Sequence, residues 1–225
     1  MANDGEKRMA AERSLEYIRD GQVVGLGTGS TAAFFIELLG ARVKQGLKIR
    51  GVPTSDRAGK LAASLGIPLI QLDDVQQIDV TVDGADEFDP QLRLIKGGGG
   101  ALLREKVVAS ASRQVVIVAD SSKQVEVLGK FPLPVEVVPF AQALVVRRVE
   151  ELGARVVRRT DAAGAPFITD SGHQILDCYF GEIDAPELLA RRLSDMPGVM
   201  EHGLFIGLAS VVLVAGSGGV AEIRR

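Results

Sequence analysis

The sequence predicts an α/β protein that combines a doubly wound, mostly parallel sheet with a second, smaller α+β domain. Short apolar runs typical of buried strands alternate with longer stretches of helical periodicity, which favours βαβ units. Turns rich in glycine, hydroxyl or carboxylate side chains follow several of these runs. A proline-rich segment at residues 132–139 changes the composition and marks where the smaller domain begins.

Length and composition are those of an ordinary globular chain. The 225 residues allow one large domain or two small ones, and an apolar content of 46% is sufficient for a hydrophobic core. A net charge of −3 without any basic block argues against a nucleic-acid partner. The first residues alternate in charge and the apolar runs are too short to span a bilayer, so we expect no signal peptide and no membrane partner.

Cysteine and histidine are scarce. The single Cys178 has no partner for an internal disulfide, which indicates a reducing, cytoplasmic location. Neither His173 nor His202 stands in a sequence that resembles a zinc site. We therefore expect no metal.

Residues 1–131 predict the larger sheet. A helix over residues 1–19 shows apolar side chains at roughly helical spacing among charges. Ligand sites of such sheets lie beyond the carboxyl ends of the strands, where the polar turns of this chain fall. In chain order, the other predicted elements are strands at 23–24, 48–52, 67–72, 78–82, 94–96 and 114–118, with helices at 32–39, 57–65 and 101–111.

Residues 132–206 predict the smaller domain, whose elements follow the order βαββαβ of the ferredoxin-like fold. Residues 209–215 then return as a strand to the first domain. We assign residues 1–131 and 207–225 to a Rossmann-like catalytic domain and residues 132–206 to the ferredoxin-like domain. The smaller domain comprises a strand within 132–139, a helix at 140–152, strands at 155–159 and 167–179, a helix at 185–193 and a strand after residue 198.

The segment at residues 94–107 organises the candidate site. A short strand ends at Lys96, four glycines follow, and Glu105 lies in the helix that begins next. Glycines let backbone N–H groups approach an anion, and a helix N-terminus adds partial positive charge. A cation, several donors and a carboxylate suit proton abstraction from carbon and stabilisation of the resulting oxyanion. A mobile glycine linker is the second interpretation, but its flanks would be polar.

The turn at residues 25–31 resembles the first phosphate-binding turn of a doubly wound sheet. Ser30 stands where the dinucleotide fingerprint has its third glycine, and no acidic residue closes a second strand, so a nicotinamide cofactor is disfavoured. The hydroxyls of Thr28, Ser30 and Thr31 beside a helix start favour a small phosphate monoester. A capped helix without a ligand would need only one of them.

Two further groups follow strands at the same predicted edge. Lys123 comes soon after the strand at 114–118. Carboxylates crowd the end of the strand at 78–82, and for Glu87 and Asp89 a solvated turn or a divalent-cation loop stays open as an alternative. The four carboxylates are Asp83, Asp86, Glu87 and Asp89.

These motifs together resemble ribose-5-phosphate isomerases of the A type, over the whole chain. The resemblance implies interconversion of D-ribose 5-phosphate and D-ribulose 5-phosphate through an enediolate, in the non-oxidative branch of the pentose phosphate pathway, without a cofactor. It also implies a homodimer or a tetramer, of which we expect the homodimer. The segments that carry the resemblance are residues 25–31, 82–87, 94–106, 119–123 and 132–137.

Carried over residue by residue, the resemblance implies that Glu105 moves a proton between C2 and C1. Lys96 would stabilise the enediolate oxygens, and Asp83 would bind sugar hydroxyls and assist ring opening. Which of Lys7 and Lys123 contacts the phosphate stays open. The remaining implied substrate contacts are Gly97, Gly98 and Gly99 with the enediolate, Gly84, Ala85 and Asp86 with the sugar, and Thr28, Gly29, Ser30 and Thr31 with the phosphate.

Two other functions compete with the isomerase. An aminosugar-phosphate deaminase would use a histidine in ring opening, and both histidines lie far from these loops in sequence. A non-catalytic sugar-phosphate sensor would need a DNA-binding module, for which the first 20 residues are too few, and would not require Glu105. The sequence favours the isomerase over both.

Overall fold

The computed structural model describes residues 4–224, which form two compact units. The first unit takes the described residues up to Ala85, Arg104–Gln124 and those from Gly207 onward, and the second takes Asp86–Leu103 and Val125–Ile206. The boundary after residue 206 coincides with the predicted one. Residues 86–103 and 125–131, which we had assigned to the larger domain, group with the second unit.

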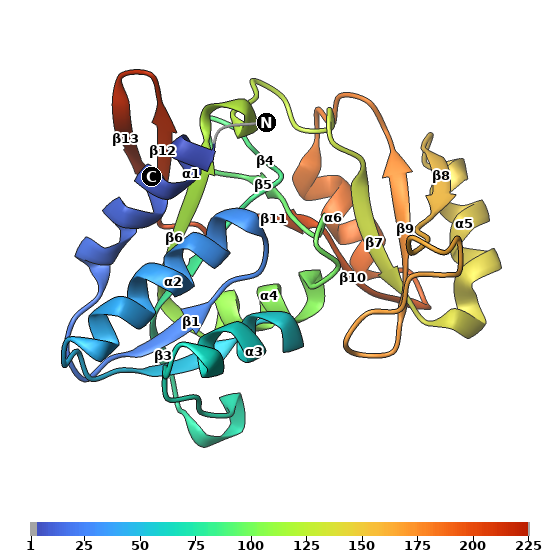
Figure 1. Cartoon of the computed structure of the whole chain (residues 1–225). Coiled ribbons are helices and arrows are strands. Elements are labelled where there is room, and N and C mark those ends of the chain that lie inside the picture. Colours follow the sequence, from blue (N-terminus) through green and yellow to red (C-terminus); the bar gives the residue numbers. More distant parts are fainter. Residues whose placement is uncertain (1–3, 225) are drawn as a thin grey trace. The chain divides into compact units, whose positions relative to one another are not determined.

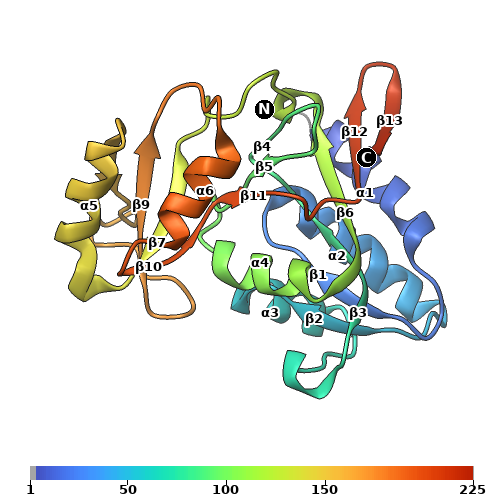
Figure 2. The same ribbon diagram turned by 180° about the vertical axis from the view of Figure 1, so that it is seen from behind.

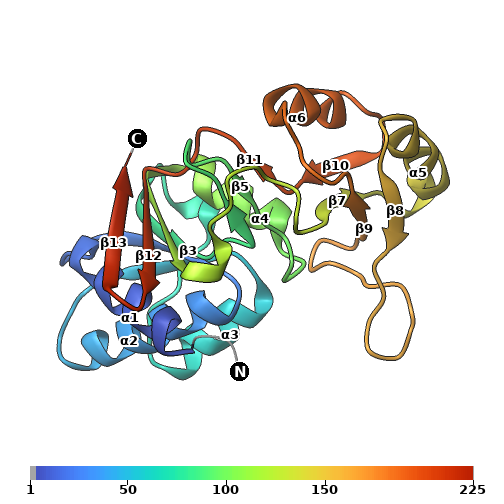
Figure 3. The same cartoon turned by 90° about the horizontal axis from the view of Figure 1, so that it is seen from above.

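The first unit contains a six-stranded sheet of order β13-β12-β6-β3-β1-β2. Every neighbouring pair is parallel except β12 with β13, which confirms the predicted doubly wound sheet. β12 returns to the sheet of the first unit as expected and pairs with β6 there, whereas its hairpin partner β13 was not predicted (Figure 3). The strands are β1 (Val23–Leu26), β2 (Arg50–Pro53), β3 (Ile78–Asp83), β6 (Ser112–Asp120), β12 (Val211–Gly216) and β13 (Gly219–Arg224).

Helices cover both faces of this sheet (Figures 1 and 2). Phe35 and Leu39 of α2 pack with α1, α3 and the buried side chains of one sheet face. Val108 of α4 packs with Val23 and Val52 on the other face. The helices are α1 (Asp4–Ser14), α2 (Ser30–Lys44), α3 (Asp56–Ser64) and α4 (Leu102–Ser110). The helix predicted over 1–19 corresponds to α1 and a 3-10 turn, Leu15–Tyr17; residues 1–3 lie outside the described part.

The strand predicted at residues 67–72 is wrong. Only Leu69 forms a bridge, to Gly51 of β2, and a 3-10 turn, Leu72–Asp74, follows. Pro68 has no N–H to offer the sheet, and Leu69 is 40% exposed at this edge. An apolar run with a proline in it therefore supplied one bridge instead of a strand.

The strand predicted at residues 94–96 exists, but it belongs to a different sheet. β5 (Leu94–Ile95) lies between β11 (Leu204–Phe205) and β4 (Glu87–Phe88) in a three-stranded antiparallel sheet. The glycine segment thus follows an antiparallel strand of the second unit. Pairing with β11 explains why residues 86–103 group with that unit. The segment 125–131 groups with it too, because the N–H of Val125 donates to Phe88 O at 3.0 Å.

The second unit also contains a four-stranded antiparallel sheet of order β10-β7-β9-β8, which confirms the ferredoxin-like prediction. Helices α5 and α6 cover one face, where Val149 and Leu193 pack on the sheet (Figure 3). The strand predicted at 167–179 is shorter than expected, because Gly172, with φ +82°, turns the chain just before it. The elements are β7 (Leu133–Val137), α5 (Gln142–Glu151), β8 (Arg155–Arg158), β9 (Gln174–Tyr179), α6 (Pro186–Ser194) and β10 (Val199–His202).

Helix α6 offers a matched test of this packing, because it carries one buried and one exposed leucine. Leu193 is fully buried, whereas Leu188 is 49% exposed. We expect Leu193→Ala to lower the free energy of unfolding by about 2–5 kcal/mol, since it leaves a cavity in the core. Leu188→Ala should cost less than about 1 kcal/mol. Urea denaturation of both variants measures the difference, and equal losses would contradict the packing described.

Candidate active site

The turn after β1 is fixed by a buried carboxylate at the end of β3. Asp83 is 2% exposed, and its Oδ1 accepts the N–H of Thr28 at 3.0 Å and the N–H of Gly84 at 2.7 Å. A Cβ on Gly27 would stand 2.2 Å from the same oxygen, so only glycine fits there. Because β1 and β3 are parallel neighbours, this single side chain binds both strand ends together.

Helix α2 begins directly after this turn. Gly29 is the N-cap residue, with φ +119°, and brings no side chain to cover the N–H groups of the first turn. Ser30 is exposed and Thr31 is 8% exposed, so the helix start presents backbone donors together with hydroxyls. Such a helix start is suited to an anion such as phosphate.

The hydroxyl of Thr28 binds the end of the next strand. Its Oγ1 lies 2.8 Å from Thr54 Oγ1 and donates to Ser55 Oγ at 2.7 Å. Thr54 in turn donates to Leu26 O at 3.0 Å, and Ser55 caps α3 by accepting the N–H of Ala58. The sequence analysis missed both residues; their signal was a Thr-Ser pair directly after β2, at the same edge of the sheet.

Two of the three predicted lysines, Lys7 and Lys123, lie in segments of the first unit that contact each other. Lys123 ends the 3-10 turn Ser121–Lys123 that follows β6. Glu6 of α1 accepts both the N–H and the hydroxyl of Ser121, at 3.0 and 2.8 Å. Lys7, the next residue of α1, is 15% exposed in its side chain and pairs with Asp4 at 3.5 Å.

Glu105 is buried in the first turn of α4, at 3% exposure. The neighbouring Arg104 pairs with Asp56 at 2.8 Å, and Asp56 is the first residue of α3. Ser55 both caps α3 and accepts the hydroxyl of Thr28. A series of contacts within the first unit therefore connects the turn at Thr28, through α3 and Arg104, with the first turn of α4, which carries Glu105.

Lys96, Asp86 and Gly97–Gly99 lie in the second unit, whereas Gly84 and Ala85 directly follow β3 in the first unit. Lys96 is 3% exposed, with its Nζ 5.4 Å from the centre of the Phe205 ring. Asp86 Oδ2 accepts the N–H of Gly98 at 2.7 Å. The Gly98 N–H is therefore engaged with Asp86 in this structure, and a ligand oxygen that binds it would have to share or replace this contact. Gly98 and Gly99 are exposed, whereas Gly97 is buried.

Glu87 and Asp89 form neither a solvated turn nor a cation loop. Glu87 is 3% exposed and accepts the N–H groups of Gly129, at 2.8 Å, and Phe131. Asp89 is fully buried, accepts the N–H of Arg93 at 2.9 Å and pairs with the Arg93 guanidinium. Both carboxylates hold loops of the second unit in place.

The structure also bears on the cysteine, on metal ligands and on membrane-spanning helices. Burial raises the pKa of the Cys178 thiol, with a smaller contribution from the charge of Asp177, so this cysteine is kept protonated. Among residues 4–224, no three His, Cys, Asp or Glu side chains gather as metal ligands would. Within the same range, no helix has the length and apolar character that crossing a bilayer requires.

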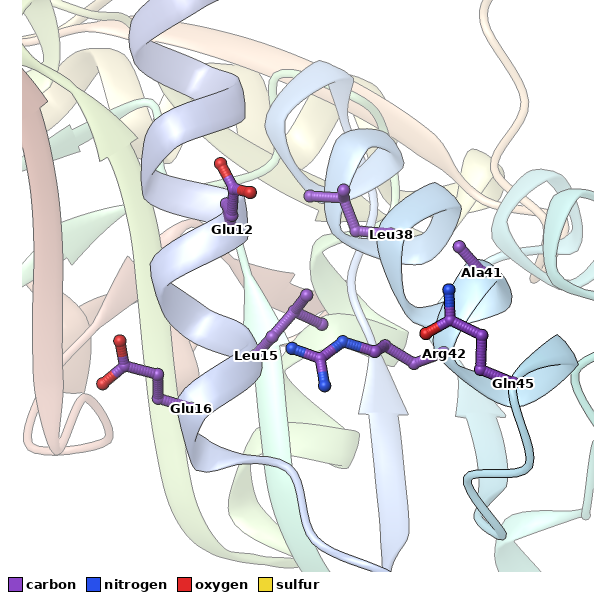
Figure 4. Close-up of a pocket in the computed structure, with 7 residues that line it drawn as sticks. All are labelled: Glu12, Leu15, Glu16, Leu38, Ala41, Arg42 and Gln45. Carbon is purple, nitrogen blue, oxygen red and sulfur yellow. The ribbon is translucent and has the colours of Figure 1, made fainter.

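A cavity of about 320 Å³ lies between α1 and α2, and Figure 4 shows the residues that line it. Arg42 extends across it toward Leu15, while Glu12 and Glu16 stand on the facing turns (Figure 4). Two carboxylates against one guanidinium disfavour a phosphorylated ligand. None of the predicted site residues lines this cavity.

The hydroxyl-rich and glycine-rich loops, with a buried carboxylate and a buried lysine close to them in the chain, are typical of α/β enzymes that act on small phosphorylated molecules. Residues 50–219 match the model of one family of this class, ribose 5-phosphate isomerase A (phosphoriboisomerase A). The chain belongs to this family and is an isomerase.

Relatives agree over the full length of the chain. It is 53% identical over 230 residues to ribose-5-phosphate isomerase A of Parvibaculum lavamentivorans, covering 100% of both proteins. The Methylorubrum extorquens enzyme of the same name is 54% identical over 219 residues, which cover 95% of this chain and 93% of that one.

Solved structures agree as well. Ribose 5-phosphate isomerase A of Methanocaldococcus jannaschii is 41% identical, with a TM-score of 0.95 and 100% of both chains covered. A D-ribose-5-phosphate isomerase in complex with phospho-erythronic acid is also 41% identical, with a TM-score of 0.97 over the whole of both chains. The α/β fold with a smaller antiparallel domain is thus the fold of the family.

Thr54 offers a test of the turn that follows β1. Thr54→Val keeps the shape of this buried side chain but removes the hydroxyl that contacts Thr28 and Leu26. We expect the affinity for inorganic phosphate to fall threefold to tenfold, the equivalent of roughly 1 kcal/mol for one hydrogen bond. Calorimetric titration measures it, with Thr81→Val as control, since the hydroxyl of Thr81 pairs with Ser112 elsewhere. An equal loss in both variants would refute the role given to Thr54.

Proposed function

We propose that this chain interconverts D-ribose 5-phosphate and D-ribulose 5-phosphate, with Glu105 as the base. The observation that carries the proposal is the buried carboxylate of Glu105, in the first turn of the helix that follows four glycines and Lys96. A carboxylate can take a proton from carbon and return the same proton to the neighbouring carbon. Such a transfer suits an isomerisation, because substrate and product contain the same atoms.

The proposed reaction begins on the open-chain aldose. Glu105 takes the proton from C2, the electron pair of that bond forms the C1–C2 double bond, and negative charge develops on O1. The hydroxyl proton of O2 passes to O1, and Glu105 returns its proton to C1, which gives the ketose. Lys96 supports the intermediate, because a buried cation stabilises an enediolate more strongly than an exposed one.

Other residues of the candidate site are proposed to bind the sugar and the phosphate. Asp83 fixes the turn at Thr28 and, we infer, contacts sugar hydroxyls and assists ring opening, with Asp86 as a second hydroxyl ligand. Remote binding of the phosphate holds the reacting carbons against Glu105. The proposed phosphate ligands are the first turn of α2 at Gly29, Ser30 and Thr31, together with Lys7 and Lys123.

The ligand of one solved relative supports this reaction. That protein is in complex with phospho-erythronic acid, which has a phosphate, hydroxyls and a carboxylate. A carboxylate is planar and shares one negative charge between two oxygens, as the enediolate does. A site that stabilises the enediolate is therefore expected to bind this acid tightly.

The contacts of the two histidines also argue against the aminosugar-phosphate deaminase. His173 Nδ1 lies 3.0 Å from the buried carboxylate of Glu136, and His202 Nε2 lies 3.2 Å from the hydroxyl of Ser194. Glu136 and His202 lie in strands of the smaller sheet and Ser194 ends α6, whereas His173 directly precedes β9. Neither histidine is in the segments proposed to bind the sugar.

We further propose a cytoplasmic homodimer that needs neither metal nor cofactor. The one buried cysteine fits a reducing compartment. Phe140 is fully exposed and Leu144, one helical turn later, is 38% exposed, which provides apolar surface for a second copy of the chain. Sedimentation equilibrium of the purified protein measures the assembly, and a monomer at micromolar concentration would contradict the dimer.

The reaction is tested with purified protein, ribose 5-phosphate and EDTA. We expect the wild type to form ribulose 5-phosphate under these conditions. Glu105→Gln should lower kcat by about 10²–10⁴-fold, because the amide keeps the size of the side chain but cannot accept the proton. Binding of phospho-erythronic acid should persist, since its contacts do not require a base.

Two results would contradict the proposal. A folded wild type that binds ribose 5-phosphate without converting it would favour the sugar-phosphate sensor. Full activity of Glu105→Gln would assign the proton transfer to another residue. Glu37→Gln, on the exposed surface of α2, serves as the control for a change of one carboxylate to an amide.

A further inference from the structure

We propose that Arg159, held in place by Asp177, is a positioning residue that orients the backbone of the glycine loop, Gly97–Gly99. The inference rests on the proposed isomerase function, in which N–H groups of this loop stabilise the enediolate. Arg159 follows β8 and Asp177 lies in β9, so both are distant in sequence from the loop. All of these residues belong to the second unit.

The Arg159 guanidinium binds two partners at once. Its Nε donates to Asp177 Oδ2 at 3.0 Å, and its Nη2 donates to Asp177 Oδ1, so the pair is bidentate. Its Nη1 donates to the carbonyl oxygen of Gly97 at 2.7 Å and to that of Gly98 at 3.3 Å. The two side chains are only 14% and 17% exposed, which shields these contacts from water.

Holding a carbonyl also sets the direction of the following N–H. No cis peptide occurs in the described part of the chain, and in a planar trans peptide the C=O and N–H point in opposite directions. With Gly97 O turned to Arg159, the Gly98 N–H points away and meets Asp86 Oδ2 at 2.7 Å. With Gly98 O turned to Arg159, the Gly99 N–H likewise points away from the guanidinium.

The loop needs such a restraint because it has few side chains of its own. Gly98 and Gly99 are exposed, and glycine loses more backbone freedom on ordering than any other residue. The Arg159 contacts supply order without occupying the exposed side of the loop. Phe167, whose N–H donates to Arg159 O at 3.0 Å, lies against Gly100 at the other end of the loop.

The positive charge of Arg159 also strengthens the loop's N–H groups as hydrogen-bond donors. A guanidinium that donates to a carbonyl polarises that peptide group, and hydrogen bonds in a chain strengthen one another. The N–H groups of the same peptides, those of Gly98 and Gly99, then become better donors, and an anionic intermediate would share or replace the Gly98 contact with Asp86. Asp177 balances the charge, so the site does not gain a net positive charge that would bind the substrate and the intermediate equally.

The decisive variant is Arg159→Met, which keeps an unbranched apolar stem and removes all four hydrogen bonds of the guanidinium. We expect kcat to fall by about 10–100-fold, as expected when oxyanion donors are misplaced, while KM for ribose 5-phosphate changes less than about threefold. The affinity for phospho-erythronic acid should fall by a similar factor to kcat, and that for inorganic phosphate should not change.

Arg159→Lys and Asp177→Asn extend the series. A lysine can reach one carbonyl but cannot bind Asp177 and both carbonyls together, so its kcat should lie between those of wild type and Arg159→Met. Asp177→Asn leaves Arg159 without its anchor and should lower kcat in the same way. The matched control is Arg93→Met, which also breaks a buried arginine–aspartate pair of the second unit, with Asp89, but leaves the loop untouched.

The outcomes separate positioning from stability. If Arg159→Met and Arg93→Met lower the melting temperature alike and neither changes kcat, Arg159 is only structural and the inference is overturned. An increase in KM with unchanged kcat would also overturn it. If the wild type itself does not convert ribose 5-phosphate, the proposed function fails; if the wild type is active and the Arg159 series equals it, only this inference fails.

Discussion

The buried carboxylate of Asp83 is the contact on which the first half of the site depends. It accepts N–H groups from Thr28 and Gly84, one on each of two adjacent parallel strand ends. A carboxylate so placed stabilises both turns, and burial makes each of these hydrogen bonds costly to lose. The close fit of Gly27 against Asp83 follows from the same contact, since any Cβ there would displace it. The glycine of this turn and the aspartate are therefore one structural unit.

Sequence reasoning found what is local and periodic. The strand–turn–helix segments around Thr28 and Glu105 and the ferredoxin-like order could be predicted, because apolar periodicity and turn residues act over a few neighbours. What it missed depends on contacts between distant residues. The run at 67–72 resembled a strand, but Pro68 at a sheet edge allowed a single bridge. Arg159 lies in an ordinary polar stretch, and only folding brings it to Gly97, 62 positions away in the chain.

The division into two units explains why the domain boundary was difficult to predict. The chain passes between the units after Ala85, after Leu103 and after Gln124, and each passage lies in or directly beside a motif of the candidate site. None of these three points lies in a proline-rich segment such as the one that predicts the boundary. The proline-rich segment that predicts the boundary contains β7, the strand expected within it, and β7 lies in the middle of the smaller sheet.

The loop at residues 97–100 needs glycine chiefly because neighbouring atoms leave no room for a Cβ, and less because glycine is flexible. A Cβ on Gly98 would stand 2.5 Å from Asp86 Oδ1, and one on Gly100 would stand 2.5 Å from the Phe167 ring. At Gly97, with φ +107°, a Cβ would meet Leu102 and Pro134 at 3.0 to 3.2 Å. A flexible linker would show open space at such positions. The glycines instead allow carboxylate, ring and guanidinium to approach the backbone closely, which is what a site that stabilises charge through N–H groups requires.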